Sequence, residues 1–132
     1  MKISTKGRYA LRIMLDLAQN SKGEYIPLKD ISSRQGITIK YMEQIVPMLT
    51  RAGLVRSLRG NNGGYMLSRE PEEYTIGEIL RCAEGSLAPI ACLEDETNQC
   101  PRKEGCKTLV FWEGMRDVVY NYADGKTLKD LL

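Results

Sequence analysis

The sequence predicts a mainly α-helical protein with one small two-stranded hairpin, arranged as a winged helix-turn-helix head followed by a long C-terminal helix. Three observations predict this fold class. Apolar residues recur at helical spacing in several segments, two short helical segments meet at a glycine turn, and an alternating hairpin pattern follows them directly. The 132 residues are 42% hydrophobic and 27% charged, a composition typical of one globular domain with a small appendage.

The first two helices are marked by their caps and by a glycine. Residues 4 to about 20 are expected to form a helix that Ser4 or Thr5 caps. Its apolar face comprises Ala10, Leu11, Met14, Leu17 and Ala18. A short helix should follow from about Pro27 to Arg34, because Pro suits a first helical position, and Gly36 then supplies the turn.

The next helix has the position of a recognition helix. Thr38 is a candidate N-cap for a helix that runs from Ile39 to about Ala52. Its apolar side chains are Met42, Ile45, Val46 and Leu49. Pro47 lies inside this helix, where it removes a backbone hydrogen bond, so we expect a kink or a tightened turn near Glu43–Val46.

A hairpin follows the recognition helix. Residues 54–59 alternate in the manner of a strand, residues 60–64 are all Gly or Asn and form the turn, and residues 65–68 form the returning strand. Arg56 and Arg59 flank the tip of this hairpin. An ordinary surface hairpin with solvated arginines is the alternative, but the helix-turn-helix directly upstream favours a DNA-binding wing.

The second half of the chain contains two more helices around a loop. Residues 75–84 predict a helix in which Thr75 and Glu78 match a capping box. Residues 86–107 form a charge-rich loop that holds three of the four cysteines, and Leu128, Leu131 and Leu132 can pack back on the head. From Thr108 to about Ala123 a long helix carries an apolar stripe, which is either core or a dimer seam. The stripe comprises Phe111, Met115, Val118 and Tyr122, widened by Leu109, Trp112 and Val119.

The charge of the chain is unevenly divided. Residues 1–70 hold 12 Lys and Arg against 5 Asp and Glu, a net charge of +7, whereas residues 71–132 hold 7 against 12, a net charge of −5. A basic half is typical of a protein that binds a polyanion, although an uneven surface charge without any partner gives the same count.

The sequence lacks the features that are typical of several classes of protein. The chain has no His, the commonest general base and metal ligand, and it has no phosphate-binding glycine loop. We therefore expect no enzymatic activity and no small-molecule substrate. No apolar run approaches the ~20 residues of a membrane span, and no secretory signal is visible, so a cytoplasmic protein without membrane contact is expected.

Several stretches of the chain resemble the Rrf2 family of bacterial winged-helix transcription regulators. They are MKISTKGRYALRIMLDLA, YMEQIVPMLTRAGLVRSLRGNNGGYML, YTIGEILRCAEG and the three-cysteine loop. Within the family the chain is similar to the IscR-like iron–sulfur sensors and, in its opening, to the CymR-like regulators of cysteine metabolism. The resemblance implies a homodimer in which the long C-terminal helix crosses to the partner and two winged heads bind a partly palindromic operator.

The predicted DNA face combines basic side chains that neutralise phosphates with side chains that reach base edges. The candidates for phosphate contact are Lys6, Arg8, Lys29, Lys40 and Arg51. The start of the recognition helix offers Thr38, Lys40, Tyr41, Glu43 and Gln44, and the resemblance places the last four on the groove-facing surface. Glu43 can accept from a cytosine amino group and so discriminate between sequences, whereas Arg59 at the wing tip suits a narrow minor groove. A solvated surface is the alternative for each, and capping alone explains Thr38.

Three cysteines make the loop a candidate metal centre. Seven residues separate Cys92 from Cys100, and five separate Cys100 from Cys106. The chemistry alone leaves an iron–sulfur cluster and a zinc site close together, because structural zinc normally takes four thiolate or imidazole ligands. A disulfide framework requires an oxidising compartment, which nothing in the sequence indicates. The resemblance to the IscR-like sensors implies a cluster, of the 2Fe–2S type, held by these three cysteines.

The loop departs from the IscR-like pattern at two points. That pattern usually has five residues between its first two cysteines, and its usual His is replaced here by Leu109, which cannot ligate a metal. The fourth ligand is therefore open between an acidic loop residue, a residue near the partner's N-terminus, a small thiol and Cys82. The acidic candidates are Glu94, Asp95, Glu96 and Glu104. We interpret Cys82 as a small buried hydrophobe in mid-helix.

These inferences divide the chain into three parts: a winged helix-turn-helix DNA-binding domain over residues 1–85, a cluster-binding loop over 86–107, and a dimerisation helix with its tail over 108–132. We expect a homodimeric transcription regulator, a repressor that binds double-stranded operator DNA, senses iron–sulfur cluster status and controls cluster assembly genes. The alternatives are a regulator of cysteine or sulfur metabolism that acts through a protein partner, a nitric-oxide- or redox-sensing cluster regulator, and a zinc-stabilised interaction module without a DNA role.

Overall fold

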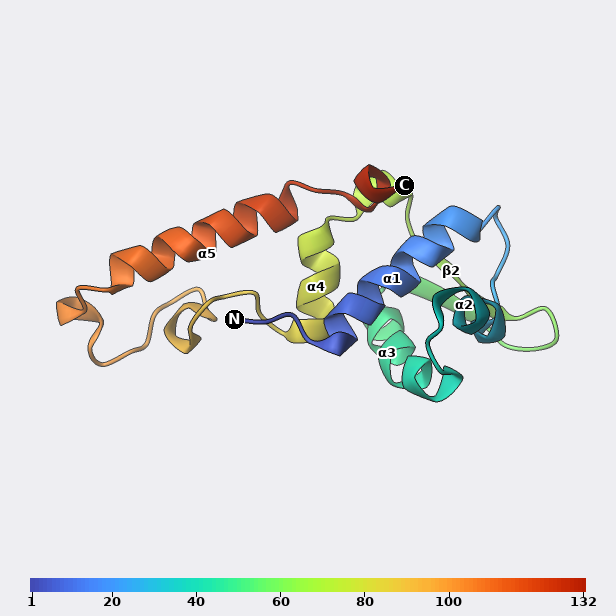
Figure 1. The fold of residues 1–132 in the computed structure, drawn as a ribbon, viewed down its shortest axis with the longest axis horizontal. Coiled ribbons are helices and arrows are strands. Elements are labelled where there is room, and N and C mark those ends of the chain that lie inside the picture. Colours follow the sequence, from blue (N-terminus) through green and yellow to red (C-terminus); the bar gives the residue numbers. More distant parts are fainter.

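The computed structural model describes all residues from 1 to 132 and has a helical head with a projecting helical arm (Figure 1). The head contains α1 (Thr5–Asn20), α2 (Leu28–Gln35), α3 (Ile39–Arg51), β1 (Val55–Leu58), β2 (Gly64–Leu67) and α4 (Ile76–Glu84). The arm is α5 (Leu109–Asp124), and single turns of 3-10 helix lie at η1 (Pro71–Glu73), η2 (Ala91–Leu93), η3 (Lys103–Gly105) and η4 (Leu128–Leu131). The predicted fold class, mainly helical with one hairpin, is confirmed. None of the helices combines the length and the apolar character needed to cross a bilayer.

Side-chain caps set where the helices begin. The Ser4 hydroxyl accepts a hydrogen bond from the Gly7 N–H at 3.2 Å, and the Thr38 hydroxyl accepts one from Tyr41 at 3.1 Å. Thr75 likewise accepts from the Glu78 N–H at 3.0 Å. The predicted capping box is only half formed, because the Glu78 carboxylate pairs with Arg69 at 2.7 Å instead of turning back to its own helix.

The helix-turn-helix is formed by α2 and α3. The α2 helix begins one residue later than predicted, because Pro27 occupies the N-cap position. Gly36 ends α2 in a left-handed conformation with φ of 66°. The α3 helix continues without interruption through Pro47 and ends at Arg51.

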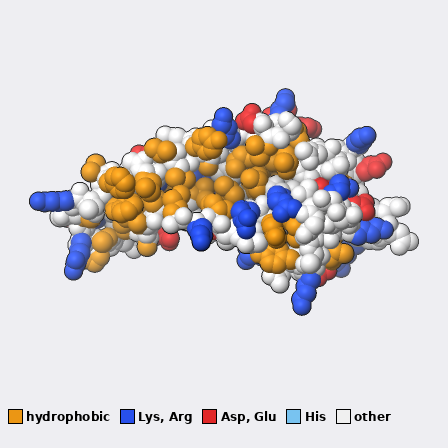
Figure 2. Space-filling model, in the orientation of Figure 1, with side chains coloured by type: hydrophobic (Ala, Val, Ile, Leu, Met, Phe, Trp, Pro, Cys, Tyr) orange, Lys and Arg blue, Asp and Glu red, His pale blue; other side chains and the backbone are white.

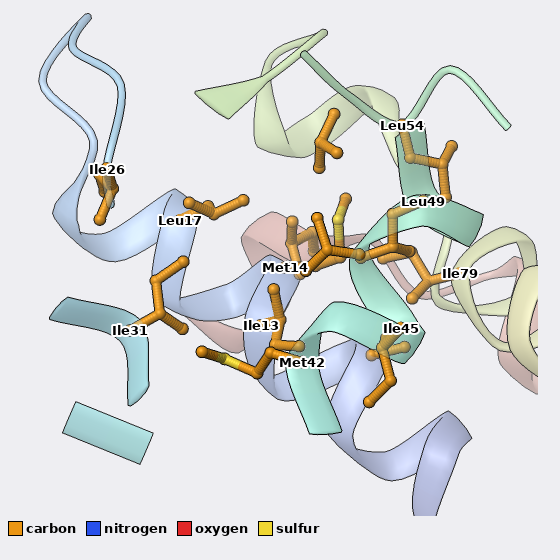
Figure 3. Packing of buried hydrophobic residues seen from close by; sticks show 14 of the residues in the cluster. Ile13, Met14, Leu17, Ile26, Ile31, Met42, Ile45, Leu49, Leu54 and Ile79 are labelled. Carbon is orange, nitrogen blue, oxygen red and sulfur yellow. The ribbon is translucent and has the colours of Figure 1, made fainter. Parts of the chain in front are cut away.

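The core of the head is built around α1. Ile13, Met14 and Leu17 are at most 1% exposed, and Figure 3 shows Ile13 beside Met42 of α3 and Leu17 on the side of Ile26 and Ile31. The 16-residue cluster is completed by a further α1 residue, Ala10, and by residues of the other elements and the segments between them: Ile26, Ile31, Ile37, Met42, Ile45, Val46, Leu49, Leu54, Val55, Tyr74, Ile79 and Leu128. Burial of this shared apolar surface is the main stabilising contribution to the head.

A buried tyrosine ties the hairpin to the head. The hairpin is antiparallel, with Val55 opposite Leu67 and Leu58 opposite Gly64. The Tyr74 side chain is 0% exposed, and its hydroxyl donates to the Leu54 carbonyl at 2.6 Å. The same oxygen accepts from the N–H groups of Ser68 and Arg69, both at 2.9 Å. One hydroxyl therefore joins both strand ends to the segment that leads into α4.

The arm is attached to the head at one end. Arg81 of α4 forms a two-pronged ion pair with Asp124 of α5, with N–O distances of 2.6 and 2.9 Å. After α5, the chain returns to the head: the Ile76 N–H donates to the Lys126 carbonyl at 2.8 Å, and Leu128 is fully buried. Of the three leucines expected to pack back, only Leu128 is buried; Leu131 is 45% exposed beside Leu11 and Leu80, and Leu132 is 57% exposed.

Replacing Tyr74 with Phe should lower the free energy of unfolding by about 1–3 kcal/mol, because three buried backbone groups lose their shared partner. Urea denaturation at fixed pH measures this change. The matched control is Tyr25→Phe, which removes a hydroxyl from a half-buried side chain outside the core cluster. Equal stability of the two variants would show that the Tyr74 hydroxyl contributes nothing to the fold.

Candidate nucleic-acid interface and cysteine segment

The start of α3 presents polar side chains to solvent. Lys40, Glu43 and Gln44 are all exposed, and their spacing of three and four residues places them on one helix face. Thr38 is exposed as well, but its hydroxyl is used for capping. Such a surface is what a helix needs to enter the major groove, because its N-terminal residues are the ones that reach base edges.

Tyr41 serves partly as a packing residue. Its ring meets the ring of Tyr9 edge-on, with centroids 5.4 Å apart and an interplanar angle of 78°. Such edge-to-face pairs stabilise by about 0.5–1.5 kcal/mol beyond area burial. The contact holds the second turn of α1 beside the first turn of α3. Lys6 and Arg8 lie in the first turn of α1, directly before this contact.

The predicted phosphate contacts come from three elements. Arg8 is exposed and donates to the Thr5 hydroxyl at 3.2 Å, while Lys6 is half-buried. Lys29 is exposed in the first turn of α2, and Lys40 is exposed in the first turn of α3.

A groove of about 480 Å³ separates the C-terminal half of α3 from the hairpin. Arg51 lines it from α3, and Arg59 lines it from the hairpin turn. Thr50 and Ser57 add hydroxyls to its wall. The sequence does not predict that either hydroxyl is a site residue. The groove forms only when the hairpin packs against α3, and no local sequence pattern indicates this contact.

The hairpin is fixed at its base by a third extended segment. Ile26 and Tyr65 exchange backbone hydrogen bonds of 2.8 and 2.9 Å, which adds a bridge outside the two strands. Gly64 stands at this contact with φ of 152°, and a Cβ there would overlap the Ile26 carbonyl. Only glycine therefore fits at this position. Arg59 lies exposed beyond it, at a tip whose base is held to the head.

The structure does not bring the three loop cysteines together. No group of three or more His, Cys, Asp or Glu side chains in the structure is arranged to hold a metal ion. Cys92 and Cys100 are half-buried and Cys106 is exposed. Three thiolates suit iron or zinc chemically, but in this arrangement they do not form a site that fits a cluster.

Two thiols differ in their environments. The Thr108 hydroxyl lies 3.5 Å from Cys106 Sγ, and this hydrogen bond, supported by backbone N–H groups of Thr108 and Leu109, lowers the pKa of the Cys106 thiol. Burial raises the pKa of Cys82, whose thiol donates to the Met48 carbonyl at 3.6 Å. Cys82 packs against the core as predicted, but it is half-buried rather than buried and lies in the last turn of α4 rather than in mid-helix.

Comparisons with known proteins agree with this geometry. Residues 3–132 match the Rrf2 family, described as an iron-dependent transcriptional regulator. The HTH-type transcriptional regulator CymR of Bacillus subtilis is 44% identical over 131 residues, which cover 99% of this chain and 89% of the relative. The HTH-type transcriptional regulator IscR of Escherichia coli is 36% identical over 132 residues, which cover 100% of this chain and 80% of the relative.

Solved structures show the same fold. The structure of CymR, the global cysteine regulator of B. subtilis, superposes with a TM-score of 0.79 at 43% identity, covering 99% of this chain and 95% of that one. The structure of T. potens IscR superposes with a TM-score of 0.78 at 37% identity, covering 99% and 85% of the two chains. Both relatives are transcriptional regulators rather than enzymes, and the winged helix-turn-helix assignment is confirmed.

Replacing Arg59 with Ala should weaken binding to duplex DNA by about 1–3 kcal/mol, because we expect the exposed guanidinium at the hairpin tip to enter a groove. Fluorescence anisotropy with a labelled duplex of about 30 base pairs, long enough for two half-sites, measures the affinity. The thermal melting temperature should not change, since the side chain is exposed. Lys103→Ala, which removes an exposed cation from the cysteine segment, is the control. Equal affinities for the two variants would show that the hairpin does not contact DNA.

Proposed function

Because this chain belongs to the Rrf2 family of transcriptional regulators, we propose that it is a homodimeric repressor that binds operator DNA and senses iron–sulfur cluster status. Its targets would include cluster assembly genes. The observation that carries the proposal is the combination, in one short chain, of a recognition face on α3 with a three-cysteine segment inserted between head and arm.

Operator recognition follows from the exposed face of α3 and the hairpin. We place α3 in the major groove, with Lys40, Glu43 and Gln44 facing base edges and Arg59 in the adjacent minor groove. Lys6, Arg8 and Lys29 would neutralise phosphates on either side, which supplies affinity without sequence preference. Glu43 repels phosphates, so it favours binding only where a base edge donates to its carboxylate.

Dimerisation through α5 is supported by the apolar surface that the arm exposes. Val110, Phe111, Val118 and Tyr122 are between 59% and 76% exposed. Figure 2 shows hydrophobic side chains gathered along this arm. Large contiguous apolar patches on a soluble protein mark interaction sites, and a second copy of α5 presents a complementary stripe of the same kind. Two heads held in this way would meet two half-sites of a palindrome.

Cluster binding is supported by the donor chemistry and by the iron-dependent description of the family. Cys92, Cys100 and Cys106 are the ligands we propose, and thiolates are the usual protein ligands of iron–sulfur clusters. The arrangement in the structure does not fit such a cluster, because the three cysteines form no common site. The proposal therefore requires the segment 86–107 to change conformation before it can bind iron.

Regulation of cysteine metabolism through a protein partner is the second candidate function. The identity of 44% with B. subtilis CymR, compared with 36% with E. coli IscR, favours it. The two candidates share the DNA-binding head and differ in the ligand of the segment 86–107. Iron and sulfide content decides between them.

Selection from a randomised duplex library tests the shared part of both proposals. The wild-type protein should enrich an inverted repeat with half-sites about one helical turn apart, as expected for a two-fold symmetric dimer. Enrichment of a single half-site would contradict the dimeric arrangement. Failure to enrich any sequence would contradict operator recognition.

Replacing both Met115 and Val118 with Glu should convert the dimer to monomers, because two carboxylates would be buried without partners at the seam. Sedimentation velocity measures the mass. The control carries Gln19→Glu and Gln99→Glu, which add the same charge at two exposed positions outside α5. Monomers in both variants would indicate a charge effect, and a dimer in the first would rule out this face.

Replacing Cys92, Cys100 or Cys106 with Ala should each abolish or strongly destabilise the cluster, because each removes one of only three thiolate ligands. Cys82→Ala is the matched control and should retain the cluster, since that thiol packs against the head core. Visible absorbance with iron and sulfide assays after anaerobic reconstitution provides the measurement. Loss in Cys82→Ala would make Cys82 the fourth ligand, and zinc uptake by the wild type without any cluster would overturn the sensor proposal.

A further inference from the structure

The end of α4 is joined to the beginning of α1 by a carboxylate. Glu84 is the last residue of α4, and its Oε1 accepts a hydrogen bond from the Ser4 N–H at 2.9 Å. The same oxygen accepts from the Ser4 hydroxyl at 2.6 Å. Ser4 is the N-cap of α1, so Glu84 holds the residue on which the start of that helix depends.

A glycine makes this contact possible. Gly7 is buried in the first turn of α1, and a Cβ at this position would overlap Glu84 Oε1. The atom that a Cβ would meet is the end of a flexible side chain, so an alanine here would displace the carboxylate rather than the backbone. A side chain at position 7 would therefore break the contact between Glu84 and Ser4 without any change to either of those residues.

The first turn of α1 carries cations directly before the point where α1 contacts the start of α3. Lys6 and Arg8 are in this turn, and Lys2 precedes it. The edge-on contact between Tyr9 and Tyr41 places the following turn against the start of α3. A displacement of Ser4 would therefore move these cations relative to the DNA that α3 reads, while the core around Ile13 and Met14 would stay in place.

We propose that Glu84 is a positioning residue for DNA binding, which holds the N-terminal cations in register with the recognition helix. It touches no DNA itself and acts through Ser4. The inference rests on the proposed DNA-binding function and adds to it a residue from α4, outside the helix-turn-helix and the hairpin. Positioned cations contact phosphates at a lower entropic cost than cations on a loose segment.

Two variants break the contact from opposite sides. Glu84→Ala removes the acceptor, and Gly7→Ala displaces the carboxylate while it raises the helix propensity of α1. Each should bind the duplex selected from the library about tenfold more weakly at physiological salt. The slope of log affinity against log salt should become shallower by about one to two, because fewer phosphates are neutralised. A random-sequence duplex should show the same change in slope.

Two controls separate positioning from general destabilisation. Glu84→Gln keeps an acceptor oxygen for Ser4, so its affinity for DNA should stay within about twofold of that of the wild type. A change of this size is smaller than the loss of one typical hydrogen bond would cause. Glu72→Ala removes an exposed carboxylate from η1 and should not weaken binding. Thermal melting of each variant is recorded in parallel, and Gly7→Ala should melt no lower than the wild type.

The outcomes distinguish this inference from the function on which it rests. If the wild type binds DNA and both alanine variants keep its affinity and salt slope, Glu84 has no positioning role. If affinity falls only in step with the melting temperature and the slope is unchanged, Glu84 is merely structural and the inference fails. If the wild type binds neither duplex, the proposed function itself is overturned.

Discussion

The orientation of the recognition helix depends on a buried carboxylate, that of Asp16. This side chain of α1 is 0% exposed and accepts hydrogen bonds from Arg34 at 2.8 and 3.0 Å and from Gln35 at 2.9 Å. Arg12 closes the network by donating to the side chain and the carbonyl of Gln35. The last turn of α2, which leads through Gly36 into α3, is therefore fixed to α1 by directional bonds. A buried charge that loses its partners costs several kcal/mol, so this geometry has few alternatives.

The arm is held much less firmly than the recognition helix. Its ion pair between Arg81 and Asp124 has side chains that are 32% and 43% exposed, and such pairs contribute about 0–1 kcal/mol. The pair lowers the pKa of Asp124, so its contribution is present above the ordinary carboxyl pKa and is lost as the pH falls through the lowered value. An arm attached in this way can adopt its final angle when its exposed apolar face is covered by a partner. The spacing of the two heads would then be a property of the dimer.

The sequence predicts what local chemistry determines. Features that depend on neighbours in the chain could be predicted: the caps at Ser4 and Thr38, the turn at Gly36 and the hairpin between residues 54 and 68. Contacts between distant segments could not be predicted. The Glu78 carboxylate accepts a hydrogen bond from Arg69 rather than from its own helix, and the Glu84 carboxylate accepts one from Ser4, 80 positions away. The cysteines show the same limit. Their spacing indicates a site, but an irregular segment whose only regular structure is two short 3-10 turns does not by itself hold three sulfurs together.

Hydroxyl-radical footprinting of the wild-type protein on its selected duplex tests whether two identical winged heads bind one palindromic operator. Two symmetric heads should give two protected stretches of equal strength, related by two-fold symmetry and separated by about one helical turn or a multiple of it, with minor-groove protection beside each from the hairpin. A single protected stretch, or protection that follows the backbone without symmetry, would contradict it.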